Sequence, residues 1–434
     1  MCIRDSNGGA GRDNSIDYYD PQTGEAVKLI STDLPSDRIL WSPRIGFNWD
    51  VKGDATSQLR GGSGIFTGRI PFVWLGNQVS GADDSFLQIM DPDYKWPQVW
   101  RTSLGFDHRF ESNYIVTLDL SYNKDINAVH VQNWGLKDPT GTLAGVDNRA
   151  IYVAADHGAN DAYVMTNSDK GSAFNATVKL QKTFENGLYA SVAYNYLKSK
   201  DVNSIEAEIT GDAFAFNPAL GNVNNDVLSN SKYGDNHRFI GVATKKWKYG
   251  HDKWATTVST FLEYAQGGRF NYTYGGDING DGSSVNDLIY IPTTAEIGQM
   301  TFSGAGQAEA FDKFIAQDKY MRDRRGQYAD RYGAISPWRG RCDLKLLQDY
   351  NFRVSSASEK KNTIQFSIDI LNFGNFINSD WGVVQVPTSV QPIGVTVAGN
   401  TPTYTFNNAP AKTFSYDASL TSRWQMQFGI RYIF

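Results

Sequence analysis

The last eleven residues, Trp424–Phe434, alternate between apolar and polar side chains with a period of two. Counted back from the C-terminal end, every second residue is large and apolar: Phe434, Tyr432, Ile430, Phe428, Met426 and Trp424. The residues between them are polar or small, with the exception of Ile433. Successive side chains of a β-strand point to opposite faces, so the segment predicts a strand with one apolar and one polar face. Such a strand suits the wall of a barrel between lipid and a polar lumen.

The composition agrees with a chain that is built from many such strands. Aromatic residues make up 13% and charged residues only 20% of the 434 residues. No segment approaches the roughly 18 consecutive apolar residues of a membrane helix. A soluble all-β protein shares these numbers, but the aromatic excess together with repeated period-two segments favours a membrane barrel. The net charge of −5 gives no electrostatic basis for binding nucleic acid.

The period-two segments come in pairs, and we count about eleven of them. Some are joined by short turns, of which Glu185–Gly187 carries the Asn-Gly pair that favours a tight hairpin. Five long connections lie between the pairs, at about residues 67–97, 124–171, 199–235, 267–337 and 374–419. This asymmetry predicts an all-β, antiparallel transmembrane barrel with periplasmic turns and long extracellular loops. The first strand leads into a short turn, so the eleventh strand ends at the same side, which predicts a periplasmic C-terminus.

The sequence is expected to be a fragment of a longer protein. Met1–Gly11 has no apolar core of a signal peptide, although an outer-membrane protein must be exported. An odd number of strands also leaves free edges, whose unpaired amides lipid cannot solvate. We therefore expect residues 1–40 to be the end of an N-terminal segment or a loop, and residues 41–434 to be the C-terminal part of a barrel.

Six segments resemble the C-terminal half of TonB-dependent outer-membrane receptors, particularly the Oar-like group with an N-terminal carboxypeptidase-regulatory-like domain. They are Ser42–Phe47 (SPRIGF), Leu59–Arg69 (LRGGSGIFTGR), Asp277–Pro292 (DINGDGSSVNDLIYIP), Arg325–Gly326 with Pro337–Trp338, Asp369–Asn378 (DILNFGNFIN) and Arg423–Phe434.

The resemblance implies a 22-stranded barrel, of which this chain supplies strands 12 to 22. It also implies that the protein lies in the outer membrane of a Gram-negative bacterium, where its partners are the membrane lipid, the barrel assembly machinery that reads the final strand, and the TonB–ExbB–ExbD complex. TonB would act through an N-terminal plug region, which this sequence lacks together with the first half of the barrel.

One acidic segment has the spacing of a calcium-binding loop. Asp277, Asn279 and Asp281 occupy positions 1, 3 and 5 of an EF-hand-like pattern, and Gly282 follows at position 6. Position 12 is Leu288 instead of a carboxylate, and Asp287 lies one residue early. The alternative interpretation is an Asx-rich turn in a long surface loop. The first interpretation predicts a Ca²⁺ site formed by Asp277, Asn279, Asp281 and Asp287, where the ion would hold the long loop together.

The sequence shows no pattern of an enzyme. Ser63 lacks the Gly-x-Ser-x-Gly frame of a nucleophile elbow. The five histidines are scattered, without an HExxH motif or a pair four residues apart: His108, His130, His157, His237 and His251. We expect no catalytic residue and no organic cofactor.

Two features of the loops are read mainly as packing. Gln307–Arg322 has the periodicity of an amphipathic helix whose apolar side faces inward. The residues on that side are Phe311, Phe314, Ile315 and Tyr320. Four loop tryptophans are candidates for stacking on a ligand, although packing within the loops or at the membrane interface explains each of them more simply: Trp74, Trp96, Trp134 and Trp381.

Three functions from different classes fit these observations to different degrees. A TonB-dependent importer of a nutrient is implied by the resemblance, whereas the periodicity alone predicts only a barrel. A passive porin or a surface adhesin needs the barrel but no plug. A soluble all-β surface protein predicts charges on both strand faces, which the alternating segments contradict. The transported substrate is set by variable loops and is not readable from the scaffold.

Overall fold

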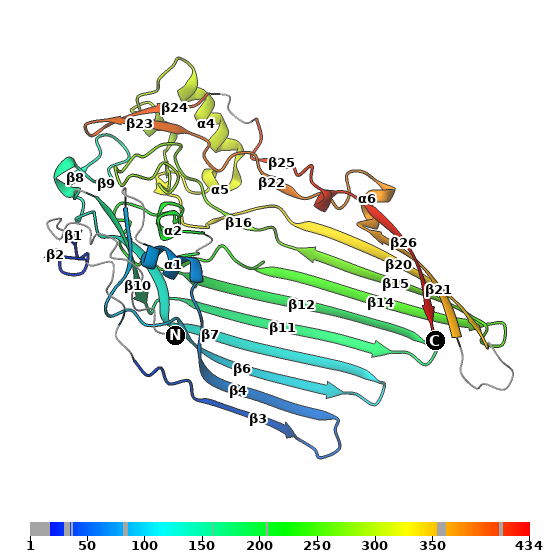
Figure 1. Ribbon diagram of the computed structural model, residues 1–434. Coiled ribbons are helices and arrows are strands. Elements are labelled where there is room, and N and C mark those ends of the chain that lie inside the picture. Colours follow the sequence, from blue (N-terminus) through cyan, green and yellow to red (C-terminus); the bar gives the residue numbers. More distant parts are fainter. Residues whose placement is uncertain are drawn as a thin grey trace.

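The computed structural model describes residues 18–29, 35, 38–80, 86–158, 160–204, 207–353, 362–407 and 411–434. Within them, one large sheet contains a continuous path of eleven strands in the order β26-β21-β20-β15-β14-β12-β11-β7-β6-β4-β3 (Figure 1). The strands are β3 (Arg44–Asp50), β4 (Ser57–Thr67), β6 (Gln98–Arg109), β7 (Tyr114–Asn133), β11 (Ser172–Thr183), β12 (Leu188–Asp201), β14 (His237–Tyr249), β15 (Trp254–Ala265), β20 (Arg339–Phe352), β21 (Asn362–Leu371) and β26 (Gln425–Ile433). Each pairs antiparallel with its neighbours in this order, which confirms the predicted eleven-stranded antiparallel arrangement.

The two faces of this sheet differ in their average polarity. Val178 lies opposite Tyr194 and Val192 opposite Gly241, so the apolar positions of neighbouring strands share one face. That face is exposed: 51% of Val192 and 70% of Phe428 are accessible. The residues that alternate with these apolar positions form the other face, which is mainly polar and includes a few apolar residues such as Ile240 and Val242. The predicted alternation therefore extends from the last strand to the whole sheet.

The described short turns between strands of the eleven-strand path lie at one end of the sheet, together with the C-terminus (Figure 1). The Asn186–Gly187 turn closes the hairpin of β11 and β12, where Gly187 has a φ of +80° and donates its N–H to the Phe184 carbonyl at 3.0 Å. A positive φ is strained for residues other than glycine, which explains the glycine here. At the same end, Ile433 near the C-terminus pairs with Thr363 near the start of β21.

The long connections meet at the opposite end of the sheet and form a compact loop assembly (Figure 1). β5 (Phe86–Met90), β10 (Asp161–Ser168) and β13 (Ser229–Asn230) extend the sheet there. Short strands of the assembly are β1 (Tyr18–Tyr19), β2 (Ala26–Val27), β8 (Gly141–Thr142), β9 (Ala150–Ile151), β16 (Arg269–Phe270), β17 (Tyr290–Ile291), β18 (Gln327–Tyr328), β19 (Ala334–Ile335), β22 (Gln385–Pro387), β23 (Gly394–Ala398), β24 (Thr401–Thr405) and β25 (Phe414–Tyr416). Its helices are α1 (Phe72–Ser80), η1 (Ala154–Asp156), α2 (Thr210–Ala215), α3 (Thr294–Ile297), α4 (Gln307–Gln317), α5 (Lys319–Arg322), α6 (Phe373–Ile377) and η2 (Leu420–Ser422).

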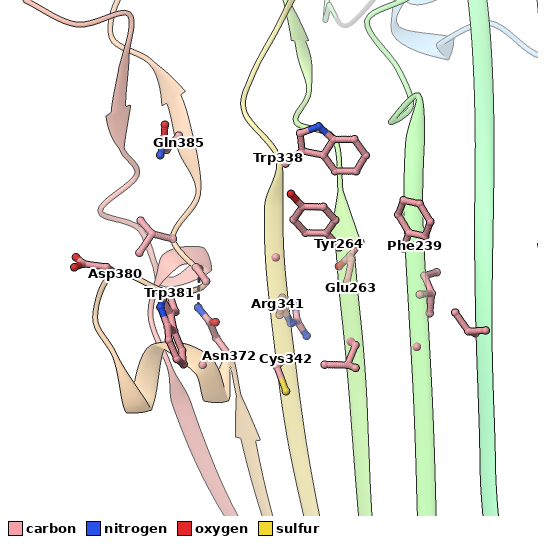
Figure 2. A pocket seen from close by; sticks show the side chains of 18 residues that line it. Phe239, Glu263, Tyr264, Trp338, Arg341, Cys342, Asn372, Asp380, Trp381 and Gln385 are labelled. Atoms are coloured by element: carbon pink, nitrogen blue, oxygen red, sulfur yellow. Dashed lines mark hydrogen bonds between the residues drawn. The ribbon is translucent and has the colours of Figure 1, made fainter.

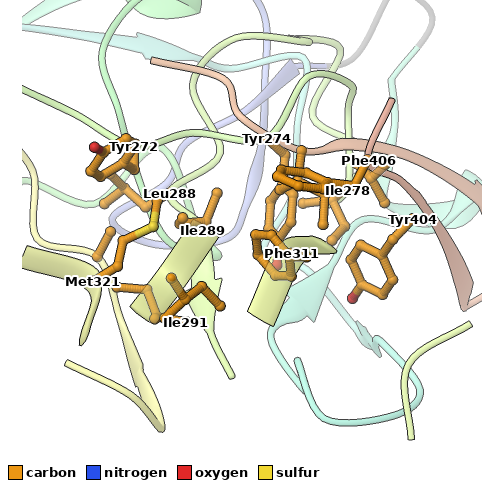
Figure 3. Packing of buried hydrophobic residues seen from close by; sticks show 14 of the residues in the cluster. Tyr272, Tyr274, Ile278, Leu288, Ile289, Ile291, Phe311, Met321, Tyr404 and Phe406 are labelled. Carbon is orange, nitrogen blue, oxygen red and sulfur yellow. The ribbon is translucent and has the colours of Figure 1, made fainter. Parts of the chain in front are cut away.

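The three buried hydrophobic clusters of the described residues are built from the loop assembly and the strand ends that enter it. In the largest cluster, Tyr274, Ile278 and Leu288 pack with residues of α4 and with Tyr404 (Figure 3). The part of the sheet that carries the short turns contributes to none of the three. The loops therefore share a core with the strand ends that enter them, whereas the part of the sheet that carries the short turns has none.

The expected amphipathic helix is present but divided. Phe311, Phe314 and Ile315 are buried, as predicted, on α4. The helix ends at Asp318, whose backbone is extended and whose carboxylate accepts the Met321 N–H at 2.8 Å, which starts α5 as a separate turn. A side-chain cap inside the segment thus overrides the continuous periodicity.

Two strands form the ends of the eleven-strand path. Within the described residues, β3 pairs only with β4, and β26 pairs only with β21, so the sheet does not close on itself. Each outer edge presents a row of unpaired backbone groups. Among the helices of the described residues, none has both the length and the apolar character that are needed to cross a membrane.

Replacing Gly187 by alanine tests the turn. We expect Gly187→Ala to lower the free energy of unfolding by about 1–2 kcal/mol, because alanine is strained at positive φ. Gly76→Ala in α1 is the matched control, since its added methyl group meets no atom within 4 Å; it should leave stability unchanged or raise it by up to about 1 kcal/mol. Urea unfolding of the chain in detergent measures both. Equal effects of the two substitutions would contradict the assigned turn.

Candidate functional site

The polar face of the sheet carries a series of ion pairs, which join strands that are neighbours or are separated by one strand. Arg60 reaches the carboxylates of Asp107 and Asp119, which lie on the next two strands. Further pairs follow across the sheet: Arg238 with Glu263, Lys246 with Asp349, and Lys345 with Asp369, at nitrogen–oxygen distances of 2.6, 3.3 and 2.7 Å. These side chains are partly exposed, so each pair contributes little to stability. Because these charged side chains all lie on the polar face, that face is suited to contact water or a polar partner.

A groove of about 720 Å³ lies near the loop end of β14, β15 and β20. Val192, Leu262 and Cys342 line it from the apolar face, and Asn372 and Trp381 border it from the segment around α6 (Figure 2). On its rim, the rings of Tyr264 and Trp338 stack with centroids 4.8 Å apart. The lining is mainly aliphatic and aromatic, which suits an apolar chain better than a reacting substrate.

The acidic loop brings three of its four predicted residues together. The Asp277 carboxylate accepts the backbone N–H groups of Gly280, Asp281 and Gly282, at 2.6, 3.2 and 2.9 Å. The Asn279 side-chain oxygen accepts the Asp281 N–H at 2.9 Å. The loop therefore curls around its own acidic side chains, in the manner of an Asx turn.

Asp281 is the most buried carboxylate of the curled part of the loop, with 4% of the residue accessible. The side-chain amides of Asn279 and Asn286 both donate to its Oδ2, at 3.3 and 2.8 Å. Burial, which disfavours the charged form, raises the pKa of Asp281 to about 6. Asn286 is fully buried, and its Oδ1 has no hydrogen-bond partner.

The fourth predicted residue, Asp287, lies against a buried arginine. Its Oδ1 accepts a hydrogen bond from Nη1 of Arg149 at 3.1 Å, and its Oδ2 accepts one from the Ile278 N–H at 3.1 Å. Arg149 also donates to both oxygens of Asp147, at 3.0 and 2.8 Å, and Asp147 further accepts the Tyr274 hydroxyl at 3.0 Å. Burial lowers the pKa of Arg149, but the adjacent Asp147 and Asp287 outweigh it and raise the pKa, so the guanidinium stays charged.

Sequence reasoning missed Arg149 and Asp147. They are separated from Asp287 by 138 and 140 positions, and nothing in the local pattern of either segment points to the other. The only signal was a charged pair, two residues apart, within a long connection. The buried network joins the loop after β7 to the loop after β15, so it fixes the arrangement of the loop assembly.

Other candidate residues are spread over the molecule. His108 bonds to Ser57 on the neighbouring strand, His237 stacks against Trp338, and His130 is buried beside Asn224. In the part of the chain that is described, no three side chains of His, Cys, Asp or Glu are grouped as metal ligands usually are. Of the four loop tryptophans, Trp74 and Trp134 are buried in the hydrophobic clusters, whereas Trp96 and Trp381 are exposed.

Comparison with solved structures finds partial similarity to outer-membrane proteins. The outer membrane transporter YddB from Escherichia coli aligns over 90% of this chain and 40% of its own, with 13% identity and a TM-score of 0.42. Two mutants of the ferric enterobactin receptor PfeA from Pseudomonas aeruginosa align over 77% of this chain and 35% of theirs, with 11% identity and a TM-score of 0.37. This chain thus spans less than half the length of these proteins. No family model matches the sequence. No curated protein matches it either.

The buried arginine network gives a stability prediction. We expect Arg149→Met to lower the free energy of unfolding by about 3–5 kcal/mol, because it leaves two buried carboxylates without their cation. Arg322→Met is the matched control, since Arg322 is half exposed in its pair with Asp323 and should contribute less than about 1 kcal/mol. Denaturant unfolding, followed by tryptophan fluorescence, measures both. A loss of less than 1 kcal/mol in Arg149→Met would show that the network does not hold the loops.

Proposed function

We propose that this chain is the C-terminal part of an outer-membrane receptor barrel that takes up a nutrient by a TonB-dependent mechanism. The observation that carries the proposal is the exposed apolar face of the eleven-stranded sheet. Side chains such as Val192 and Phe428 are 51% and 70% exposed. Exposed apolar patches of a soluble monomer are rarely larger than a few hundred Å², and a face of this extent calls for lipid or a partner.

The dimensions of the strands support a membrane location. Strands such as β11 and β15 contain 12 residues each. At about 3.3 Å per residue and a tilt near 40°, such a strand spans roughly 25–30 Å, the height of a hydrocarbon layer. The antiparallel ladder also satisfies the backbone polar groups between strands, as a lipid environment demands. The two open edges then fit a larger barrel, in which further strands pair with β3 and β26.

The unequal ends of the sheet support an orientation for the proposed barrel. Outer-membrane barrels have short turns on the periplasmic side and long loops outside. In this proposal the short turns and Phe434 lie in the periplasm, where the barrel assembly machinery would recognise β26. The loop assembly then faces outward and captures the nutrient.

The TonB-dependent mechanism rests on the six sequence segments that resemble such receptors. The ion-paired polar face would then enclose a plug region, which belongs to the missing N-terminal part. Uptake would be driven by the TonB–ExbB–ExbD complex, which would act on that plug rather than on the residues of this chain. A passive porin or a surface adhesin needs neither a plug nor the TonB–ExbB–ExbD complex. Whether uptake depends on TonB therefore separates these alternatives from the proposed function.

A charge placed on either face tests the membrane location. We expect Val192→Arg to lower stability in lipid vesicles by about 2–4 kcal/mol, because the guanidinium would enter hydrocarbon. Ser191→Arg, on the next residue of the same strand, places the same charge on the polar face and should cost less than about 1 kcal/mol. Guanidinium unfolding of the vesicle-embedded parent protein measures both. Equal losses would contradict a lipid-facing apolar surface.

Uptake by the full-length parent protein tests the proposed mechanism. Cells that express it would be compared with and without TonB, with candidate nutrients supplied one at a time as the sole source. We expect growth on one nutrient that disappears when TonB is removed, while its accumulation falls at least tenfold. Uptake that persists without TonB would indicate a passive porin. Surface expression without uptake of any nutrient would favour an adhesin.

A further inference from the structure

The groove beside α6 contains two glycines that belong to the apolar face of the sheet. Gly241 of β14 pairs with Leu262, and Gly340 of β20 pairs with Tyr264, so both glycines share the face of these side chains. Both line the groove. Because a glycine has no side chain, the apolar face is lower at these two positions. The groove volume of about 720 Å³ lies within the roughly 300–1,000 Å³ of small-molecule sites.

The backbone does not require glycine at either position. Neither residue has a positive φ. A methyl group added at Gly241 or Gly340 would meet no atom closer than 3.4 Å, which is an ordinary contact distance. Glycine inside a strand weakens it, and it often marks a place where a ligand approaches the backbone closely. The two glycines therefore indicate that the groove has an occupant.

The segment after β21 stands against the sheet and forms one wall of the groove. The Phe376 ring of α6 packs edge-on against Trp424, with ring centroids 5.0 Å apart, and Trp424 leads into the apolar positions of β26. The Asn372 N–H donates to the Asp343 carboxylate of β20 at 2.8 Å. Trp381 lines the groove from this wall (Figure 2). The groove therefore lies between a fixed loop segment and the sheet, and it continues into the exposed apolar face.

The loop end of the groove is aromatic and offers no unpaired cation. The stacked rings of Trp338 and Tyr264 are 40% and 52% exposed. Arg341 is the only basic residue that lines the groove within the described part of the chain, and its Nε already donates to both oxygens of Asp343, at 2.8 and 2.9 Å. Phosphate groups are bound mainly by Arg and Lys, so this rim does not suit them. The Gln385 side chain, which can donate and accept hydrogen bonds, also lies at this end (Figure 2).

We propose that the groove binds one glycolipid of the outward membrane leaflet, an inference that rests on the membrane location proposed above. The acyl chain lies along Gly241 and Gly340 and reaches the bilayer past Val192 and Leu262, which belong both to the groove and to the exposed apolar face. The sugar lies on the aromatic rim, at the level where amphipathic rings meet polar head groups. The aromatic rings cover the apolar face of the sugar, and Gln385 forms hydrogen bonds with its hydroxyl groups.

Native mass spectrometry of the full-length parent protein, released from vesicles, tests the proposal. The vesicles would contain equal amounts of monoglucosyl diacylglycerol and phosphatidylcholine with the same acyl chains. We expect one retained glycolipid for each protein, in at least fivefold excess over phosphatidylcholine. Gly241→Leu fills the groove and should lower glycolipid retention at least fivefold. Ala243→Leu, two residues further along the same face of β14 and outside the groove lining, is the matched control and should retain the glycolipid unchanged.

Trp338→Leu separates recognition of the sugar from binding of the acyl chain. The leucine keeps the position apolar but removes the ring, so the excess of glycolipid over phosphatidylcholine should fall below twofold while one lipid is still retained. Trp254→Leu, at the turn end of β15, is its control and should keep the excess.

Flotation of the same samples with their vesicles reports membrane insertion independently of the groove. Protein that does not float would overturn the membrane location and this proposal together. Floating protein that retains both lipids equally, or that loses the glycolipid equally in Gly241→Leu and Ala243→Leu, would overturn the glycolipid site alone.

Discussion

The rest of the structure depends on one constraint, which is the exposed apolar face of the antiparallel sheet. The backbone polar groups of the sheet form hydrogen bonds between strands, but no second protein layer packs on that face. In a soluble sheet that face is buried by a second layer, which supplies most of the stability. Here the buried clusters lie in the loop assembly, and side chains such as Phe428 remain exposed. The environment around the sheet must then remove this apolar face from water, as a second protein layer does in a soluble sheet. A hydrocarbon layer of matching height is the environment that fits these strands.

The loop assembly solves a different problem, because long connections must be held in one arrangement without a regular scaffold. It does so with its own hydrophobic core and with a buried polar network that centres on Arg149. The stability of such a network depends on every partner, since loss of one partner leaves a buried charge without its counter-ion. It also fixes which loops meet, as Arg149 contacts Asp287 from a segment 138 positions away.

The sequence allowed the sheet to be predicted but not the contacts within the loops. Alternation with a period of two and the Asn186–Gly187 pair are local signals, so the strands, their number and the short turns follow from neighbouring residues. The division of the helix at Asp318 was missed because one side-chain cap outweighs a continuous apolar periodicity. The acidic loop was visible from its spacing, whereas Arg149 gained its meaning only from burial and from partners distant in the chain.

The central claim is that the apolar face contacts lipid and the polar face contacts water, and spin labels on two adjacent residues test it most directly. Val178→Cys and Thr177→Cys, made in a background without the native cysteines, place a label on each face of β11 in vesicle-embedded parent protein. The account predicts that the label at Val178 collides with oxygen, which partitions into lipid, and that the label at Thr177 collides with a water-soluble nickel complex. Equal access of the nickel complex to both labels would contradict a membrane wall.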